Sequence, residues 1–411
     1  MNNTGSIKIR LTILQFMQFF IWGSWLISFG KYMDSMGMKD NIGTLLATAG
    51  IASLIMPAIV GIIADRWLNS ERLLGILHLL AAGSLFMASK AATFNDLYLY
   101  MFMNALFFMP TISLSYSVCY SIMDKYKMDT VNDFPPIRTM GTVGFIIAMW
   151  IVSIAGWEKS NYQLLLASGA SVFLGLYSFS LPPSPPTRAS KESSMMSKLG
   201  LDALVLLKQK KIALFFLFAT LLGICLQITN SYGSTFIDSF SDEYPNSFAV
   251  KYNNIFLSIS QISEALFILA VPFFLRKYGI KIVMLMSFGA WVLRFGLFGI
   301  GYPEGIGMVW LTLSMIVYGM AFDFFNISGS LFIEQETPSK FRSSAQGLLT
   351  MVTNGLGAIV GLYSAQAVIN YHTTNGVTDW SICWFIFAAY ALVIGILFAI
   401  FFKYKHVPGR I

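Results

Sequence analysis

The stretch Ile255-Phe-Leu-Ser-Ile-Ser-Gln-Ile-Ser-Glu264-Ala-Leu-Phe-Ile-Leu-Ala-Val-Pro-Phe-Phe274 decides the fold class of this chain. It is almost entirely apolar and is long enough to cross a bilayer as a helix. A carboxylate in hydrocarbon is unfavourable by roughly 2.5–3.5 kcal/mol on insertion scales, so it normally faces water or a partner. Glu264 therefore indicates a functional group at membrane depth.

A second acid, Asp323, lies in another apolar run, from Val309 to Phe332. The same physical argument applies to it, because an ionisable group inside a span is a functional group by default. Two such acids in the second half of one chain indicate a pathway for protons, ions or polar solutes.

The composition of the whole chain is that of a membrane protein. Hydrophobic residues make up 56% of the 411 residues and charged residues only 11%, whereas soluble domains have about 25% charged residues. Apolar runs of about 20 residues predict twelve transmembrane helices. These runs are centred near Phe19, Leu54, Leu80, Ala105, Ile147, Phe173, Leu222, Leu266, Phe288, Ile316, Gly357 and Val393. We therefore expect an all-α integral membrane protein in a lipid bilayer, with no soluble domain.

The lysines and arginines predict the orientation, because cytoplasmic loops retain positive charge. If the amino terminus is inside, 20 of the 27 basic residues fall in cytoplasmic segments and only five on the opposite side. Arg138 and Arg294 fall within spans or at their edges. Both termini are therefore expected in the cytoplasm.

Several classes of function are excluded by the residue pattern. The net charge of +7 is scattered over many loops, which is unlike the clustered basic face of a nucleic-acid-binding protein. Cys119, Cys225 and Cys383 lie in or beside apolar runs without metal spacing and are expected to be packing residues. No Ser-His-Asp set or metal-ligand cluster lies at a plausible depth. We expect neither an enzyme nor a bound metal or cofactor.

One linker divides the chain into two halves. Residues 182–210 begin with Pro-Pro-Ser-Pro-Pro and continue through Ser, Lys and Met to a short amphipathic piece, Leu199 to Leu207, which is expected at the cytoplasmic surface. Six predicted spans precede this linker, in residues 1–181, and six follow it, in residues 211–411. A faint repeat, in which Ala64-Asp-Arg-Trp67 corresponds to Leu275-Arg-Lys-Tyr278, supports two homologous halves.

This arrangement resembles the major facilitator superfamily of transporters. Gly61-Ile-Ile-Ala-Asp65-Arg66 is a partial copy of the superfamily's loop motif, without its following Gly and basic pair. The resemblance implies a substrate site near the bilayer midplane between the halves, with access alternating as the halves rock.

Polar and aromatic residues within the spans fall into sets at helical spacing. Each set lies on one helix face. The sets are Arg138, Thr142 and Phe145; Gln227 and Asn230; Gln261 and Glu264; and Tyr318 and Phe322. Carboxylate and amide groups suit vicinal hydroxyls, Arg, Gln and Thr suit carbonyl and ring-nitrogen acceptors, and aromatic rings suit a planar heterocycle. A sugar joined to an aromatic base meets all these requirements, whereas a plain sugar leaves the phenylalanines less well explained.

Longer strings resemble the nucleoside:H⁺ symporter family of bacterial permeases. These are Asp133-Phe-Pro-Pro-Ile-Arg-Thr-Met-Gly-Thr-Val-Gly-Phe145, Leu226-Gln-Ile-Thr-Asn230, Ser258-Ile-Ser-Gln-Ile-Ser-Glu264 and Met315-Ile-Val-Tyr-Gly-Met-Ala-Phe-Asp323. The similarity covers nearly the whole chain and implies proton-driven nucleoside uptake across an inner membrane. The family's binding residues are matched without substitution at Arg138, Thr142, Phe145, Gln227, Asn230, Gln261, Glu264, Tyr318 and Phe322. A symporter for sugars or glycosides on the same fold is the second hypothesis, and a polytopic enzyme or receptor is the third.

Each assignment has a structural alternative. Arg138 stands near a predicted cytoplasmic helix start, where it would also serve as a topology charge. Gln227 and Asn230 would also bond neighbouring helices. Arg294 would also pair with an acid and neutralise it. We expect His78 to be a hydrogen-bonded packing residue rather than a proton relay.

The proton is assigned to the two acids within spans. Asp323 follows Phe322 directly, about 100° round the same helix, so it borders the cavity without facing the ribose. We therefore expect Asp323 to be the main coupling acid and Glu264 chiefly a substrate ligand, with exchanged roles as the alternative. We expect a monomer, and the preferred base is left open by the sequence.

Overall fold

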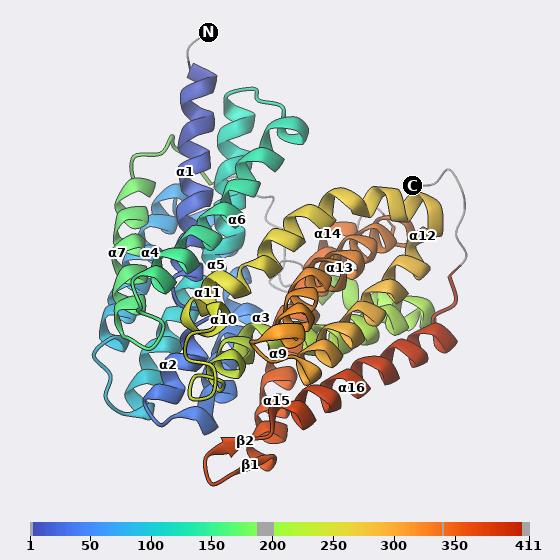
Figure 1. Cartoon of the computed structure of the whole chain (residues 1–411). Coiled ribbons are helices and arrows are strands. Elements are labelled where there is room, and N and C mark those ends of the chain that lie inside the picture. Colours follow the sequence, from blue (N-terminus) through green and yellow to red (C-terminus); the bar gives the residue numbers. More distant parts are fainter. Residues whose placement is uncertain (1–2, 187–200, 339–340, 405–411) are drawn as a thin grey trace. The chain divides into compact units, whose positions relative to one another are not determined.

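The computed structural model describes residues 3–186, 201–338 and 341–404, and nearly all of its regular structure is helical. The chain forms two compact units, which are described separately (Figure 1). Unit 1 comprises Met1–Lys39 and Thr48–Leu199, and unit 2 comprises Asp40–Ala47 and Gly200–Ile411.

Unit 1 is a bundle of helices, most of them long. They are α1 (Asn3–Gly23), the short α2 (Phe29–Ser35), most of α3 (Ile42–Arg66), α4 (Ser70–Ala88), α5 (Phe94–Lys125), α6 (Thr130–Ile154) and α7 (Tyr162–Ser178). The helix α1 packs along α6, and α4 packs against both α5 and α7. The start of α5 is fixed by its sequence, because the Thr93 side chain accepts a hydrogen bond from the Asp96 backbone N–H at 3.2 Å.

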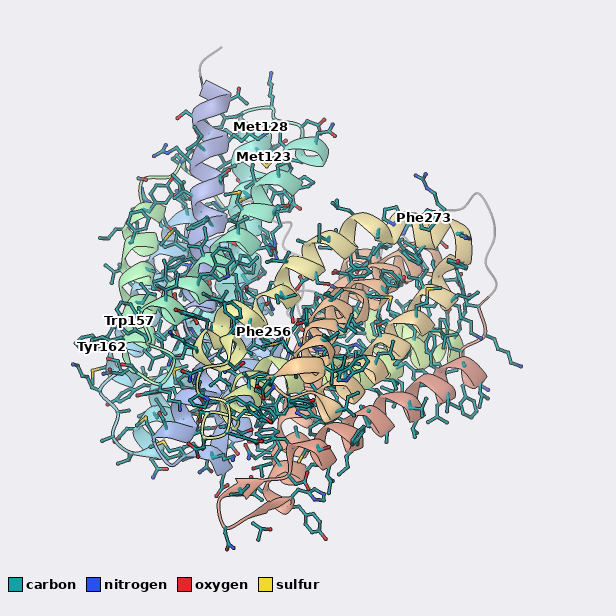
Figure 2. All side chains as sticks on the ribbon, viewed as in Figure 1. Met123, Met128, Trp157, Tyr162, Phe256 and Phe273 are labelled. Carbon is teal, nitrogen blue, oxygen red and sulfur yellow. The ribbon has the colours of Figure 1, made fainter. Side chains whose placement is uncertain are left out.

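The turns of unit 1 lie at alternating ends of the bundle. Met123 and Met128 flank the turn from α5 to α6, and Trp157 and Tyr162 flank the next turn, at the opposite end (Figure 2). The Trp157 and Tyr162 rings pack together with centroids 5.6 Å apart. Successive helices therefore run in opposite directions, as helices that cross a bilayer with short connections must.

The 3₁₀-helix η1 (Lys39–Asn41) spans the point in the sequence where unit 1 gives way to unit 2, and unit 2 contains the remaining elements. They are η2 (Leu201–Lys208), α9 (Lys210–Asp238), α10 (Phe248–Lys251), α11 (Asn253–Leu257), α12 (Ile259–Ile300), α13 (Gly305–Glu336), α14 (Arg342–Thr350), the π-helical turn η4 (Met351–Gly357), α15 (Ala358–Tyr371), β1 (Thr373–Thr374), β2 (Val377–Thr378) and α16 (Trp380–Phe401). Within α12, Gly279 has φ 76°, a conformation that glycine adopts readily. The chain reverses there, so α12 is two helices in space (Figure 1).

The first turn of α3 belongs to unit 2 rather than unit 1. The backbone N–H of Gly43 donates to Gln366 Oε1 at 2.7 Å, and the Tyr232 hydroxyl donates to the same oxygen at 2.8 Å. A Cβ on Gly43 would overlap the Leu362 carbonyl oxygen. Glycine is therefore needed for α3 to begin this close to α9 and α15.

Aromatic side chains fill the core of unit 2. Two groups of rings pack within it, both buried. One group contains Phe236, Phe295, Phe298, Trp380 and Trp384, and the other contains Phe215, Phe288, Phe325 and Phe398. Rings of this size bury about 150–250 Å² each. They hold α9, α12, α13 and α16 together.

The prediction of an all-helical membrane protein is confirmed. Within the described residues, nine helical segments are long and apolar enough to cross a membrane, and one of them, Asn253–Ile300, contains the reversal at Gly279. The shorter α7 and the less apolar α1 are also helical where spans are predicted. The count of twelve spans stays a prediction. Most of the linker 182–210 lies outside the described residues, and its end is the 3₁₀-helix η2.

Candidate substrate-binding site

In unit 2, the helices α12 and α13 bring Glu264 and Tyr318 together. A Cβ on Gly319 would overlap the backbone of Ser263 and Glu264, so the two helices approach closely only because this position is glycine. The Ser263 hydroxyl donates to the Ile316 carbonyl oxygen across the same contact. This approach places two of the predicted site residues on touching faces.

Tyr318 is the centre of the unit 2 cluster. Its ring is buried and stacks on Phe322 with centroids 6.3 Å apart and planes 11° apart. Its hydroxyl donates to Asn230 Oδ1 at 3.5 Å, at the long limit of a hydrogen bond. Trp291 meets the Tyr318 ring edge-on at 6.0 Å. The sets predicted on α9 and α13 are therefore in contact.

Most polar groups of this cluster have unused hydrogen-bonding capacity. Gln227 makes no hydrogen bond with any residue that the structure describes. Gln261 Oε1 and Asp323 Oδ2 are buried without a partner in the same part of the chain. Unpaired buried polar atoms are rare in proteins and are unfavourable by about 1–3 kcal/mol each. These groups lie on the same helices as Asn230, Glu264 and Tyr318, which indicates groups that bind a solute or water.

Arg294 lies behind Tyr318. It is 2% exposed, and its guanidinium carbon stands 4.5 Å from the centre of the Tyr318 ring. One guanidinium nitrogen, Nη1, donates to the Ser314 carbonyl at 2.8 Å, whereas Nε has no partner among the described residues. In the described structure Arg294 forms no ion pair with an acid. The alternative that it neutralises Glu264 or Asp323 by direct pairing is wrong.

In unit 1, Arg138 is held by groups from two other helices. Its Nε donates to the Tyr116 hydroxyl at 2.7 Å. Its guanidinium carbon lies 4.1 Å from the centre of the Phe19 ring, which is cation–π distance. Gly141 and Gly144 allow this contact, because a Cβ at either position would overlap α1.

Thr142 and Phe145 lie on the same helix as Arg138. Thr142 is half-buried, and Phe145 is 9% exposed, with the Trp22 ring edge-on to it at 6.4 Å. A Cβ on Gly23 would overlap the Phe145 backbone. Phe145 is therefore packed against α1, in contrast to the half-exposed Phe322 of unit 2.

A set of buried polar groups around His78 in unit 1 is bonded together. His78 Nε2 lies 2.9 Å from Gln18 Oε1, and Gln18 Nε2 donates to the Thr111 hydroxyl at 2.8 Å. His78 Nδ1 lies 3.3 Å from the Ser171 hydroxyl. His78 is therefore buried and hydrogen-bonded, as predicted, and its role in packing rather than in a proton relay stays a prediction. All three cysteines are free and buried, as predicted.

Comparison with known proteins identifies the family. The family model described as "Nucleoside H+ symporter" matches residues 5–407. The chain belongs to the nucleoside H⁺ symporter family.

Relatives of this symporter match it along its whole length. It is 50% identical over 410 residues to the xanthosine permease of Escherichia coli strain K12. The alignment covers 99% of this chain and 98% of that protein. It is 47% identical over 406 residues to the nucleoside permease NupG of the same strain, covering 98% and 97%. Its fold matches the crystal structure of nucleoside transporter NupG (D323A mutant), with TM-score 0.94, 46% identity and coverage of 97% and 100%.

The comparisons confirm the prediction of fold and function. This symporter has a major facilitator fold and performs proton-coupled nucleoside uptake, and its relatives are transporters rather than enzymes. The sugar or glycoside alternative is not favoured. A D-xylose-proton symporter with TM-score 0.69 is only 12% identical, so it shows the fold alone.

The structure adds contacts that the sequence did not reveal. Tyr116 and Phe19 hold Arg138, and Arg294 supports Tyr318. These contacts join residues far apart in the sequence, so no spacing within one helix signals them. Within the described residues, no group of three His, Cys, Asp or Glu side chains is placed to bind a metal.

Proposed function

We propose that this symporter takes up nucleosides across a bacterial inner membrane with nine residues as its substrate ligands. These are Arg138, Thr142 and Phe145 of unit 1 and Gln227, Asn230, Gln261, Glu264, Tyr318 and Phe322 of unit 2. The observation that carries the proposal is the unused hydrogen-bonding capacity of Gln227 and Gln261. Gln227 stands one turn before Asn230, which accepts from Tyr318, and Gln261 one turn before Glu264. Amides suit the ribose hydroxyls, and the half-exposed Phe322 ring suits the base.

Asp323 is the proposed coupling acid. Its Oδ2 is buried without a hydrogen-bond partner among the described residues, which favours a carboxyl that takes up and releases a proton over a structural one. Glu264 is half-exposed on α12, as a ligand for ribose must be. The coupled proton therefore resides on Asp323 when substrate is bound.

The remaining features of the proposal concern organisation. Residues 1–181 and 211–411 act as two six-helix halves, joined by the linker 182–210, and access alternates between the two sides of the membrane. Both termini are cytoplasmic and the protein is a monomer. A topology reporter at Ser193, which lies outside the described residues, is expected to read cytoplasmic and one at Asn246 external. The opposite result would refute this orientation.

The substrates include purine nucleosides, among them xanthosine, in keeping with the xanthosine permease that is 50% identical. Uptake into proteoliposomes under an inward proton gradient tests this directly, with labelled xanthosine, adenosine, uridine and lactose in parallel. Nucleosides are expected to accumulate above equilibrium and to leave when a protonophore collapses the gradient. Accumulation of lactose without nucleosides would overturn the proposal in favour of a sugar symporter.

A further inference from the structure

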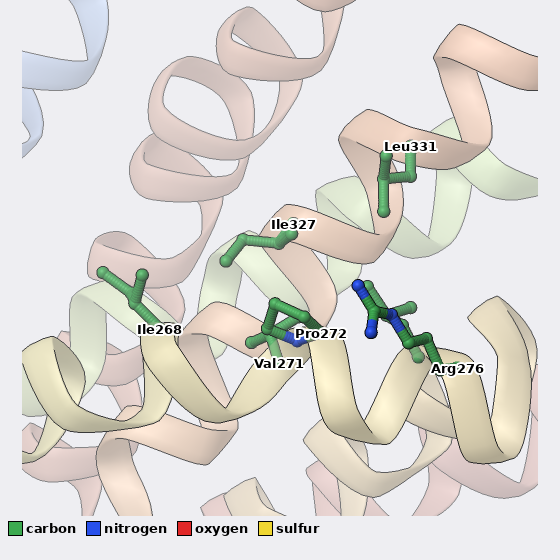
Figure 3. Close-up of a pocket in the computed structure, with 7 residues that line it drawn as sticks. Ile268, Val271, Pro272, Arg276, Ile327 and Leu331 are labelled. Carbon is green, nitrogen blue, oxygen red and sulfur yellow. The ribbon is translucent and has the colours of Figure 1, made fainter. Parts of the chain in front are cut away.

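Phe322 borders a small cavity in unit 2 that has polar groups on its rim. The cavity has a volume of about 30 Å³, and its polar lining residues are Asn326, Thr353 and Asn354. It has room for ordered water but not for a nucleobase. A base stacked on Phe322 would therefore lie at the cavity mouth, within reach of the two asparagines. This cavity differs from the groove formed by Ile268, Val271 and neighbouring residues, which is lined almost entirely by apolar side chains (Figure 3).

The two asparagines approach the cavity from different helices. Asn326 stands one turn after Phe322 on α13, so both lie on one face of that helix. Asn354 lies in the π-helical turn η4. Such turns are rare and occur frequently at functional sites, because they change the direction in which side chains point.

Glycines hold η4 in place against α9. A Cβ on Gly223 of α9 would overlap the Thr353 backbone, and a Cβ on Gly357 would lie 2.9 Å from the Thr220 carbonyl oxygen. The wide turn is therefore pressed against the helix that also carries Gln227. This contact fixes the position of Asn354 relative to the proposed ribose ligand.

Neither carboxamide is used within the protein. Asn326 and Asn354 are exposed, and neither forms a hydrogen bond with a described residue. Both lie in helical segments that are apolar and long enough to span a membrane, Gly305–Glu336 and Ser344–Tyr371. An amide left unpaired in hydrocarbon is unfavourable. Free carboxamides at this depth therefore face water or a solute.

We propose that Asn326 and Asn354 read the edge of the nucleobase and favour purine nucleosides. This inference rests on the proposed function, and in particular on stacking of the base against Phe322. The N–H₂ groups of the two carboxamides can donate to N7 and to the C6 carbonyl of a 6-oxopurine, and one carboxamide can pair with both N7 and the C6 amino group of adenine. A pyrimidine lacks the second ring and N7, so it leaves this pair of groups to water.

The test compares base preference in three variants. Asn326→Leu and Asn354→Leu remove the carboxamides, and Ser364→Ala is the matched control, because the Ser364 hydroxyl bonds only carbonyl groups of its own helix. Each protein is reconstituted, and inhibition of labelled uridine uptake by inosine, guanosine, xanthosine, adenosine and cytidine is measured. We expect purine inhibition constants to rise about tenfold in the Asn variants, with little change for uridine and cytidine.

Two outcomes would overturn the inference. One is an equal change for purines and pyrimidines, and the other is an unchanged ranking of bases in both Asn variants. Asn326→Thr and Asn354→Thr, which remain polar and small, keep the test decisive if the leucine variants do not fold. Failure of the wild-type protein to take up any nucleoside would instead refute the proposed function, so the two failures are distinguishable.

Discussion

In unit 1 the guanidinium of Arg138 is held by the Tyr116 hydroxyl and the Phe19 ring, whereas in unit 2 Gln261 Oε1 is buried without a partner among the described residues. Gln227 and Asp323 Oδ2 make no hydrogen bond with a described residue. A membrane protein retains such groups at depth when a solute or a proton uses them. The comparison teaches that unit 1 presents a preorganised cation, whereas unit 2 presents open ligands, that is, side chains with unused hydrogen-bonding capacity. The two units are expected to respond differently to mutation.

The largest effect is expected from Asp323→Asn. Asparagine keeps the size of the side chain but cannot take up or release the proton, so pH-driven accumulation of nucleoside should be lost while binding and exchange continue. Accumulation and exchange are measured in proteoliposomes. Asp242→Asn, in the exposed segment after α9, is the control and should behave as wild type. If Asp323→Asn still concentrates uridine and Glu264→Gln does not, the roles of the two acids are exchanged.

The next largest effect is expected from replacing Phe322, and it is compared with the effect of replacing Phe145. Phe322→Leu removes a half-exposed ring that stacks on Tyr318, and nucleoside affinity should fall by about 1–3 kcal/mol. Phe145→Leu removes a ring packed against Trp22, and its effect on affinity should be smaller than that of Phe322→Leu. Binding of labelled nucleoside to the purified proteins gives both values. A larger loss in the Phe145 variant would place the main stacking face in unit 1.

A smaller effect is expected from Arg294→Met. The change keeps side-chain length but removes the cation 4.5 Å from the Tyr318 ring, a contact worth about 2 kcal/mol when desolvated. The KM for nucleoside should rise. In the double variant with Tyr318→Phe, the loss of binding free energy should not exceed the sum of the losses in the two single variants. Arg276→Met, at an exposed position of α12 before the reversal at Gly279, is the control. Equal KM values for both arginine variants would remove Arg294 from the support of the site.

The smallest effect is expected from Tyr116→Phe. The variant loses the 2.7 Å hydrogen bond to Arg138 Nε but keeps the ring. A net loss of about 1 kcal/mol corresponds to a roughly fivefold rise in KM. Because Phe19 still contacts the guanidinium, transport should continue. A complete loss of uptake with normal expression would show that the hydroxyl itself binds substrate.

The sequence predicts well those features that depend on local pattern. Runs of apolar residues reveal the helices, and helical spacing places Tyr318 and Phe322 on one face, where the rings stack. It does not predict contacts between distant segments, such as Phe19 with Arg138. Nor does it predict that residues 351–357 widen into a π-helical turn, since glycines such as Gly355 and Gly357 favour close packing as readily as a change of helix type.

The central claim is that the open amides Gln227 and Asn230 of unit 2 bind the ribose hydroxyls, whereas Arg138 of unit 1 does not. The most direct test is the ratio of KM values for 2′,3′-dideoxyuridine and uridine, measured in wild type, Gln227→Leu, Asn230→Leu and Arg138→Lys. A site built to bond hydroxyls rejects analogues that lack them, because its polar groups are left unpaired. The account predicts a high ratio in wild type and Arg138→Lys and a ratio near unity in the two unit 2 variants. A ratio that collapses in Arg138→Lys but persists in Gln227→Leu and Asn230→Leu would contradict it.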